Sequence, residues 1–468
     1  MGKSKLKGKD LRKIGYKSNN AISIAIDLFS KHYKHISKNE KLDILIKIRE
    51  NPENYASDEV LSKLAHEFME KVEKEDFTIY KLSPKPKPFT VFGKKFIDSN
   101  TIHQMEMAMQ LPVAIKGALM PDAHVGYGLP IGGVLATENE LIPYGVGLDI
   151  GCRMSLSIYD LPPNYLKKNA HAVKMALKEQ THFGIKTMPT NKAEHEVLER
   201  VEFNETELLR KLHGKAAKQL GTSGSGNHFV EFGELILHDN NTLQIQPGQY
   251  IGILAHSGSR GLGATIAQYY TKLAMDSCRL PKGIQNLAWL SLDQAEGQEY
   301  WNAMNLAGDY AKACHDVIHQ KLSKALNIKP LMIIENHHNF AWKEKQKDSS
   351  QLIVHRKGAT PAKPGELGII PGSMTAPGYL VSGLGMEESL NSASHGAGRR
   401  LSRKKTRESI TGSTLKKTLK SAGVTLIDGS LDEAPTAYKN IEEVIHFQQD
   451  IIRVEGIFQP RIVRMDKA

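Results

Sequence analysis

Residues 145–159 read GVGLDIGCRMSLSIY, a glycine-rich loop followed by a short run typical of a β-strand. The loop places Asp149 and Cys152 inside a segment that otherwise consists mainly of glycine and apolar residues. Because glycine costs backbone entropy, chains use glycine clusters where the backbone approaches a ligand or adopts a positive φ. The stretch therefore predicts a strand that begins directly after a functional loop.

The same pattern of glycine-rich loops and short β-like runs extends over residues 89–468. Further β-like runs are GGVLAT at 132–137, YIGILAH at 250–256 and LMIIENHH at 331–338, and residues 302–325 form the clearest helical run. No repeat of fixed period is present, which argues against solenoids and propellers. We predict one large mixed α+β domain.

Residues 1–82 have a helical pattern instead. One amphipathic run begins at residue 22, and another follows Ser57, which we interpret as an N-cap. The sequence SPKPKP at 83–88 enforces an extended chain. We expect a small helical N-terminal unit at 1–82, a proline-rich linker at 83–88 and the large domain at 89–468.

The composition favours a globular protein of a reducing compartment. No apolar window is long enough to span a membrane, the N-terminus lacks the apolar region of a signal peptide, and three cysteines are too few for a disulfide framework. We therefore expect a cytoplasmic protein without a membrane partner. The formal net charge of +11 is compatible with a polyanionic partner. Of the two most basic stretches, we interpret residues 3–17 as a solvated tail and give more weight to residues 399–420.

Ionisable residues recur in other glycine-rich segments, and this conjunction predicts a functional site. The segments are MPDAHVGYGLPIGG (Asp122, His124), GTSGSGNHFVEF (Asn227, His228, Glu231), LAHSGSRGLG (His256, Arg260), ENHHNF (His337, His338), HRKGAT (His355, Lys357), IIPGSM (Ser373) and SHGAGRRLSR (His395, Arg399, Arg403).

A metal site is the first chemistry that these residues allow. Asp149 and Cys152 can present a carboxylate and a thiolate to one ion, with imidazoles from His228, His256 and His338. Ligand chemistry alone favours zinc over manganese, and a shared sulfur would permit a binuclear centre.

Nucleotide binding would need an unusual phosphate-binding site, because the sequence has neither a P-loop nor a strand-linked GxGxxG motif. The backbone amides of PGSM and HGAG, beside Arg399 and Arg403, could form an anion nest. His395 is then placed where a nucleophile could meet a phosphorus atom.

The ordered motifs PDAHVGYGLPIGG, GVGLDIGCRM, GSGNHFVE, AHSGSRGLG, HHN, HRKGAT, PGSM and SHGAGR resemble the RtcB family of GTP-dependent RNA ligases over residues 89–468. The resemblance implies β-sheets surrounded by helices. It also implies a manganese enzyme that joins RNA with a 2′,3′-cyclic phosphate or 3′-phosphate to RNA with a 5′-hydroxyl, as in tRNA splicing and RNA repair. Water would open the cyclic phosphate, and a histidine–GMP adduct would then pass GMP to the RNA 3′-phosphate.

The resemblance also implies roles for individual residues. His395 would be the guanylylated nucleophile and Asp122 its orienting carboxylate. Two manganese ions would be held by Asp149, Cys152 and His228, and by Cys152, His256 and His338. The GTP site would comprise Asn227, His228, Phe229, Val230, Glu231, His338, Asn339, Pro371, Gly372, Ser373, Met374, His395, Gly396, Ala397, Gly398, Tyr438 and Lys467. RNA phosphates would meet Arg260, Arg356, Arg399 and Arg403.

Two departures from the family pattern bear on nucleotide affinity: Gly378 stands where many relatives have a serine, and Ala468 replaces the usual terminal glycine. Two alternatives stay open. One is guanylyl capping of 3′-phosphates without sealing, and the other is a catalytically silent RNA-binding protein with a structural metal. The resemblance further implies a monomer that an archease-type activator could assist.

Overall fold

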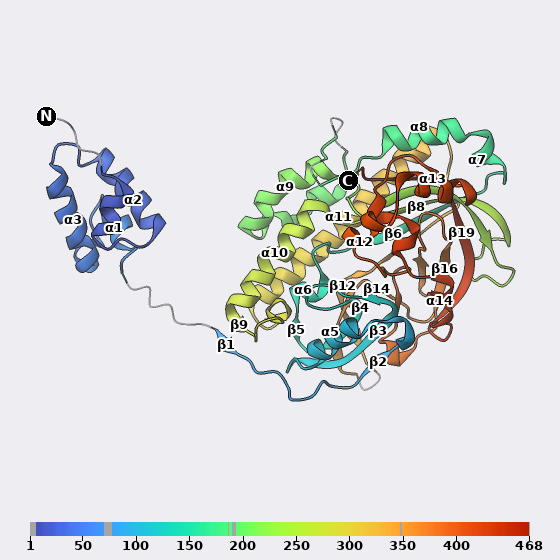
Figure 1. The fold of residues 1–468 in the computed structure, drawn as a ribbon, viewed down its shortest axis with the longest axis horizontal. Helices are drawn as coiled ribbons and strands as arrows, with labels where there is room; N and C mark the ends of the chain where they lie inside the picture. The colour runs from blue at the N-terminus through green and yellow to red at the C-terminus, as the bar shows by residue number, and fades with distance from the viewer. Residues whose placement is uncertain (1–5, 70–76, 186, 190–192, 347–348, 468) are drawn as a thin grey trace. The chain divides into compact units, whose positions relative to one another are not determined.

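The computed structural model describes residues 6–69, 77–185, 187–189, 193–346 and 349–467 (Figure 1). The chain forms two compact units, Met1–Asp76 and Phe77–Ala468. The proline-rich residues 83–88 lie inside the second unit, where the amides of Ser83 and Lys87 donate to the carbonyls of Gln110 and Met109. Within the described ranges, none of the helices combines the length and apolar character needed to cross a bilayer.

The first unit is helical, as predicted. Its elements are α1 (Gly8–Lys13), α2 (Asn19–Lys31), α3 (Lys38–Glu50), the 3₁₀ helix η1 (Pro52–Tyr55) and α4 (Ser62–Ala65). Ser18 accepts hydrogen bonds from the first amides of α2, and Ser37 forms a capping box with Glu40 at the start of α3. These side chains satisfy amides that the first helical turn leaves unpaired, so the sequence marks both starts.

Two local predictions in this unit were wrong. The basic stretch is no solvated tail, because Gly8–Lys13 form α1 and the side chains of Leu11 and Tyr16 are buried in the helical core. Residues 3–5 lie outside the described ranges. The helix predicted from Ser57 is limited to α4 among the described residues. Asp58 accepts from the amides of Val60 and Leu61 instead and holds a turn there.

The second unit contains two large sheets, which confirms the mixed α+β class. The larger sheet has the order β11 (Met332–His337), β6 (Arg153–Tyr159), β8 (Gly248–Ser257), β7 (Phe229–Leu237), β19 (Ile452–Met465), β16 (Gly378–Gly383) and β15 (Leu367–Ile370), with β18 (Thr425–Leu426) beside β19. The edge strands β11 and β15 approach each other, and the Ile369 amide donates to Asn336 Oδ1 at 2.9 Å. The sheet is therefore nearly closed on itself.

The second sheet has the order β12 (Asn339–Lys345), β13 (Gln351–Lys357), β4 (Ile131–Thr137), β3 (Ala114–His124) and β2 (Phe89–Val91). Three short pairs complete the strands: β1 (Thr78–Ile79) with β9 (Cys278–Arg279), β5 (Glu140–Leu141) with β10 (Leu290–Ser291), and β14 (Ala359–Pro361) with β17 (Ser392–Ser394). The predicted runs at 132–137, 155–159, 250–256 and 331–338 fall on β4, β6, β8 and β11.

The helices of this unit surround the sheets (Figure 1). They are α5 (Ser99–Met109), α6 (Pro143–Val146), α7 (Tyr165–Lys168), α8 (Ala170–Gln180), α9 (Glu207–Gln219), α10 (Arg260–Ser277), α11 (Ala295–Leu326), α12 (Arg403–Ser409), α13 (Gly412–Ser421) and α14 (Ile441–His446). The helix predicted from residues 302–325 is the central part of α11. One face of α11 packs with α8 on the larger sheet through Ile318 and Leu322.

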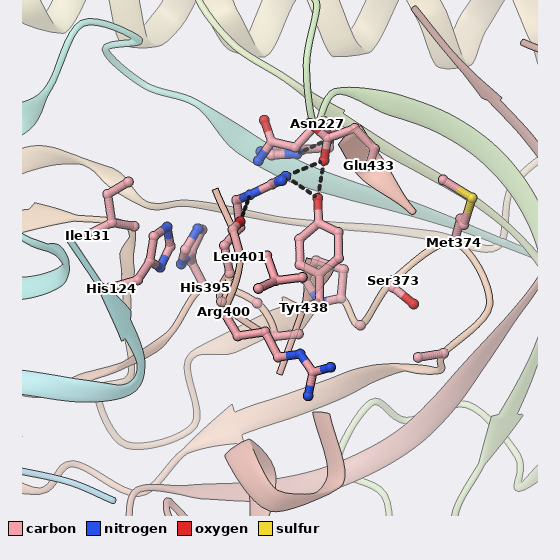
Figure 2. Close-up of a pocket in the computed structure, with 18 of the residues that line it drawn as sticks. His124, Ile131, Asn227, Ser373, Met374, His395, Arg400, Leu401, Glu433 and Tyr438 are labelled. Atoms are coloured by element: carbon pink, nitrogen blue, oxygen red, sulfur yellow. Dashed lines mark hydrogen bonds and ion pairs between the residues drawn. The ribbon is translucent and has the colours of Figure 1, made fainter. Parts of the chain in front are cut away.

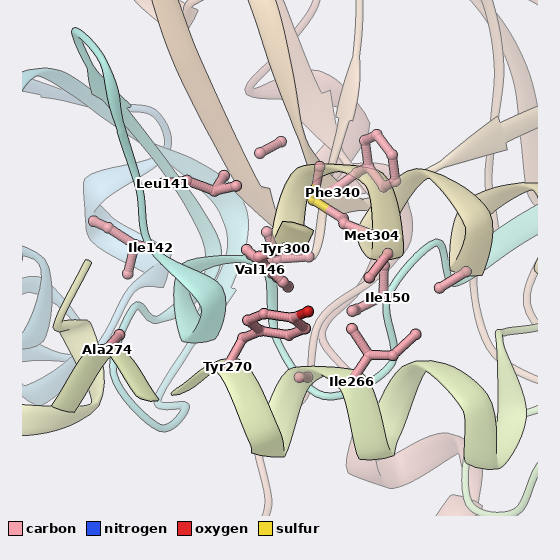
Figure 3. Packing of buried hydrophobic residues seen from close by; sticks show 14 of the residues in the cluster. Leu141, Ile142, Val146, Ile150, Ile266, Tyr270, Ala274, Tyr300, Met304 and Phe340 are labelled. Carbon is pink, nitrogen blue, oxygen red and sulfur yellow. The ribbon is translucent and has the colours of Figure 1, made fainter. Parts of the chain in front are cut away.

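The largest apolar core lies around α10 and α11 and supports the glycine-rich loop at residues 145–152 (Figure 3). Tyr270 of α10 and Tyr300 of α11 pack at a centroid distance of 5.2 Å, beside Ile150 of that loop. Gly151, with φ of +69°, lies so close to Gly308 that a Cβ on Gly151 would be 2.7 Å from the Gly308 Cα. The glycine therefore lets the loop carrying Asp149 and Cys152 sit directly on α11.

Candidate active site

The ends of four neighbouring strands bring the predicted metal ligands together. Cys152 precedes β6, His256 lies near the end of β8, His228 precedes β7 and His338 follows β11. These strands pair antiparallel, so the start of one lies beside the end of the next, with Phe229 opposite His256. Ligands that are far apart in sequence consequently meet at one edge of the larger sheet.

The ligating atoms form a compact buried cluster. Cys152 Sγ lies 3.4 Å from His228 Nε2 and 3.2 Å from His256 Nε2, and His256 Nε2 lies 3.2 Å from His338 Nε2. The Asp149 carboxylate approaches His228 Nε2 at 3.1 Å. Cys152, His228 and His256 satisfy the geometry of a metal-binding group, and Asp149 and His338 extend it on either side. All five residues predicted as ligands converge.

The protonation states of the two imidazoles suit metal binding. Burial lowers the pKa of His256 to about 3 and holds the pKa of His338 well below 6.5, so both imidazoles are neutral, the form that binds metals. His256 Nδ1 lies 3.1 Å from the Asn227 carbonyl, which leaves Nε2 directed into the cluster. Burial and Asp149 raise the pKa of the Cys152 thiol, so a cation would be needed to hold it as thiolate. Thiolate, imidazole and carboxylate together fit a divalent transition metal.

His395 is held beside this cluster by a buried carboxylate. It directly follows β17, and its Nδ1 lies 2.7 Å from Oδ2 of Asp122 on β3, whose side chain is fully buried. Burial by itself would raise the pKa of Asp122, but the hydrogen bond and charge of His395 hold this pKa below its ordinary value. An ionised Asp122 accepts the proton on Nδ1, so the lone pair of His395 is on Nε2. The imidazole is thereby prepared as a nucleophile.

A second contact fixes the loop after His395. Gly398 has φ of +73°, and a Cβ there would lie 2.0 Å from the Asp122 carbonyl oxygen. We expect Gly398→Ala to lower the free energy of unfolding by about 2–3 kcal/mol, since both a positive φ and a backbone clash oppose the methyl group. Urea denaturation measures this. Gly412→Ala is the control, since a Cβ there has nothing within 4 Å, and it should change the free energy of unfolding by less than about 0.5 kcal/mol. Equal losses of stability in the two variants would contradict the backbone clash at Gly398.

A pocket of about 790 Å³ opens over His395 (Figure 2). Of the predicted GTP-site residues, those that line it are Asn227, Phe229, Glu231, Pro371, Gly372, Ser373, Met374, His395, Gly396, Ala397, Gly398 and Tyr438. His256 and Gly378 line it as well. Burial raises the pKa of Glu231 well above its ordinary value and so favours the neutral form of this carboxyl group.

The other predicted GTP-site residues lie elsewhere. Val230 is buried in the apolar core on the opposite face of β7, because side chains alternate along a strand. Asn339 is used structurally: it donates to the Asp149 carbonyl and accepts from the Gly358 amide. Lys467 is 81% exposed and lies 3.3 Å from Asp428. His228 and His338 belong to the metal cluster, with the His338 ring 4.9 Å from that of His395.

The arginines predicted for RNA phosphates divide into two groups. Arg399 and Arg403 line the pocket. Arg356 is fully buried, pairs with Glu344 at 2.8 Å and donates to Ser392, so its guanidinium cannot meet an RNA phosphate; this prediction was wrong. Arg260 is also largely buried and donates to Thr222 and Gly184 beside the metal cluster.

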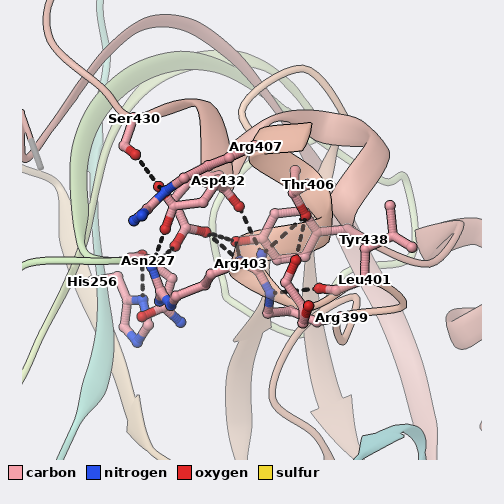
Figure 4. A network of polar contacts seen from close by, with 12 residues as sticks. Asn227, His256, Arg399, Leu401, Arg403, Thr406, Arg407, Ser430, Asp432 and Tyr438 are labelled. Carbon is pink, nitrogen blue, oxygen red and sulfur yellow. Dashed lines mark hydrogen bonds and ion pairs between the residues drawn. The ribbon is translucent and has the colours of Figure 1, made fainter. Parts of the chain in front are cut away.

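Two acidic residues of the site were not predicted from the sequence. Asp432 and Glu433 are buried and form ion pairs with the pocket arginines (Glu433 in Figure 2, Asp432 in Figure 4). Arg399 Nη1 lies 2.9 Å from Glu433, Arg403 Nη1 lies 2.7 Å from Asp432, and the Tyr438 hydroxyl donates to Glu433. The motif DEAPTAYK, in which two acidic residues precede Tyr438, could have indicated them, but only Tyr438 was predicted as a site residue. Asp432 and Glu433 fix the positions of Arg399 and Arg403 in the wall of the pocket.

Lys439 was missed as well. Its ammonium group donates to the carbonyls of Pro121 and Ala123, on both sides of Asp122. This pair of hydrogen bonds fixes the backbone that carries the His395 partner.

Comparison with known proteins finds relatives of one family. The family described as tRNA-splicing ligase RtcB matches residues 104–208 and 195–466. The RNA-splicing ligase RtcB of Escherichia coli K12 is 32% identical over 396 residues, covering 76% of this chain and 92% of that protein. The tRNA-splicing ligase RtcB of Nanoarchaeum equitans is 30% identical over 439 residues, covering 78% and 92%. That of Thermococcus kodakarensis is 30% identical over 422 residues, covering 75% and 88%. The helical unit Met1–Asp76 lies outside the family match.

Proposed function

The chain belongs to the RtcB family of tRNA-splicing ligases, and we propose that it joins RNA ending in a 2′,3′-cyclic phosphate or 3′-phosphate to RNA beginning with a 5′-hydroxyl, using GTP. The observation that carries this proposal is the His395–Asp122 pair, which leaves a lone pair on His395 Nε2 beside a buried metal-ligand cluster and inside a nucleotide-sized pocket.

The first covalent step is guanylylation of His395. Its Nε2 attacks the α-phosphorus of GTP, a nitrogen–phosphorus bond forms, and the bond to pyrophosphate breaks. Asp122 stabilises the positive charge that develops on the ring. Arg399 and Arg403, held by Asp432 and Glu433, supply fixed charge near the phosphates. Because these groups are prearranged, little reorganisation accompanies the attack.

RNA then receives the guanylyl group. Water opens a cyclic phosphate to a 3′-phosphate, an oxygen of that phosphate attacks the adduct, and the nitrogen–phosphorus bond breaks to release His395. The 5′-hydroxyl attacks the activated 3′-phosphate, a phosphodiester forms, and GMP leaves. His395 ends neutral and ready for another cycle.

The metal cluster would hold two Mn²⁺ ions. Asp149, Cys152 and His228 would hold one ion, and Cys152, His256 and His338 the other, with the sulfur shared. When bound, such ions act as Lewis acids that neutralise charge on reacting phosphates. The 4.9 Å between the His338 and His395 rings supports this role, since it brings the cluster to the nucleophile.

The guanosine would occupy the side of the pocket formed by Tyr438, Ser373 and Met374 (Figure 2). Tyr438 offers a ring for the base, and Glu231 offers a buried carboxyl group for the guanine edge. A Cβ on Gly378 would find only ordinary contacts, the nearest being the Pro371 Cα at 3.5 Å. The space for the family's serine is therefore present here.

The pair with Asp122 gives a direct prediction. We expect Asp122→Asn to slow formation of the GMP adduct by about 10²-fold or more, because an amide can donate to Nδ1 and so favours the tautomer with its proton on Nε2. Rapid-quench measurement of the adduct, at unchanged metal content, checks this. Asp239→Asn, at an exposed carboxylate, should match the wild-type rate. An Asp122→Asn rate within about threefold of wild type would contradict the proposed role.

The function as a whole is tested by ligation of defined RNA ends across a set of metals. With Mn²⁺ and GTP, an RNA 3′-phosphate and a 5′-hydroxyl RNA should give a sealed product, whereas a 3′-hydroxyl with a 5′-phosphate should not. A capped RNA that accumulates without sealing would favour the capping alternative. RNA binding without GTP turnover would favour the silent alternative. A cytoplasmic location, a monomeric state and an archease-type activator stay predictions.

A further inference from the structure

The loop between β3 and β4 carries an exposed aromatic ring at the pocket. Tyr127 lines the same pocket as His395, yet it is 77% exposed, and its neighbour Val125 is 54% exposed. No ring of the described residues stacks on Tyr127. A large ring left open beside a catalytic group is a surface on which a ligand can pack.

The loop is held firmly although the ring is open. Gln104 of α5 donates to the carbonyls of Gly126 and Gly128 at 2.7 and 2.6 Å, and accepts from the Gly126 amide at 3.1 Å. The Lys357 ammonium group donates to the Tyr127 carbonyl. The backbone is therefore fixed on both sides of Tyr127, so a ligand that stacks on the ring has little loop ordering to pay for.

The position of the loop separates it from the proposed guanosine site. The loop begins after His124 and ends at Ile131, and both of these residues lie on one side of the His395 ring in Figure 2. Tyr438, Ser373 and Met374 lie on the other side. His395 thus stands between two parts of one pocket, and the proposed guanosine position accounts for only one of them.

Tyr127 gives the second part a feature of single-stranded nucleic acid sites, because aromatic rings stack on bases of any sequence. Exposed Arg400 and Lys404 line the same pocket and can meet phosphates, and Figure 2 shows Arg400 on the Tyr438 side. Resting on the proposed function, we propose that Tyr127 is a stacking platform for a base near the RNA end that reacts at His395. The platform would orient the terminal phosphate towards the adduct.

The test compares Tyr127→Ala, Tyr127→Phe and the control Tyr269→Ala, at an exposed tyrosine of α10 that lies outside the pocket. We expect Tyr127→Ala to raise the Kd for a 3′-phosphate RNA and the KM for ligation by about tenfold. Tyr127→Phe and Tyr269→Ala should stay within about twofold of wild type, since phenylalanine keeps the ring. Fluorescence anisotropy with labelled RNA gives Kd independently of catalysis.

Abasic substitution makes the test specific for stacking. RNAs that lack one base at successive positions near the 3′-phosphate should include one that binds wild type about tenfold more weakly and on which Tyr127→Ala has no further effect. Unchanged RNA affinity of Tyr127→Ala, or additive losses at every abasic position, would overturn the proposal. A slowing of GMP-adduct formation by about tenfold in Tyr127→Ala would also overturn the proposal, because the ring would then contact GTP. A wild-type chain that binds RNA but forms no adduct would instead refute the proposed function.

Discussion

His395→Ala is expected to eliminate the covalent GMP adduct and to reduce RNA sealing by at least about 10³-fold. The other imidazoles near His395 lack its pairing with a buried carboxylate. His124 Nδ1 lies 3.2 Å from the Asp122 carbonyl oxygen, and His338 Nε2 lies 3.2 Å from His256 Nε2. The alanine variant should keep its metal content, because the five clustered ligands are untouched. Single-turnover ligation with matched RNA ends measures the loss.

His171→Ala is the control for this variant. His171 is exposed on α8, so its removal should leave adduct formation and sealing within about twofold of wild type. Robust adduct formation by His395→Ala would mean that another residue is the nucleophile. Normal sealing without any adduct would mean that the reaction needs no covalent enzyme intermediate.

Cys152→Ala is expected to have a comparably large effect through the metal centre. Its sulfur lies within 3.4 Å of the ligating nitrogens of both His228 and His256, so its loss removes the atom shared by the cluster. We expect bound metal to fall below the wild-type content and sealing to drop by about 10³-fold. Elemental analysis after dialysis and the Mn²⁺-dependent rise in Tm measure the first effect.

Cys278→Ala provides the matched control, since this cysteine is equally buried but lies on β9. It can lose some stability through the small cavity, but its metal content and the Mn²⁺-dependent rise in Tm should match the wild type. Full metal occupancy and activity in Cys152→Ala would refute the shared-sulfur arrangement.

Metal affinity should also depend on pH. The pKa of the Cys152 thiol is raised by burial, so a metal ion that binds the sulfur must displace its proton. Mn²⁺ affinity should therefore rise as pH increases, with proton release that calorimetry in buffers of different ionisation enthalpy detects. In Cys152→Ala this release should be smaller.

The sequence indicated several metal ligands well because Cys152, His256 and His338 stand near the ends of strands that the sequence predicts. Cys152 before β6 and His256 near the end of β8 meet because antiparallel neighbours reverse direction. The mixed α+β class followed from the same runs. The strand order, with β19 from the C-terminus between β7 and β16, depends on long-range pairing that no local pattern encodes.

Elsewhere, local patterns were insufficient. Arg356 stands in a motif rich in functional residues, yet its guanidinium neutralises buried Glu344, a contact formed only when β12 and β13 pair. Val230 lies inside the NHFVE motif but faces the core, because a strand shows alternate residues to each side. Asp432 and Glu433 could be recognised only after folding had placed them against Arg399 and Arg403.

The most direct test of the central claim is the location of GMP on the wild-type chain. Incubated with Mn²⁺ and GTP, the full-length protein should retain label from the α-phosphate but not the γ-phosphate, and peptide mapping should place it on His395 through an acid-labile nitrogen–phosphorus bond. Absence of any adduct in the metal-loaded protein, or an adduct on a lysine or another histidine, would contradict the account.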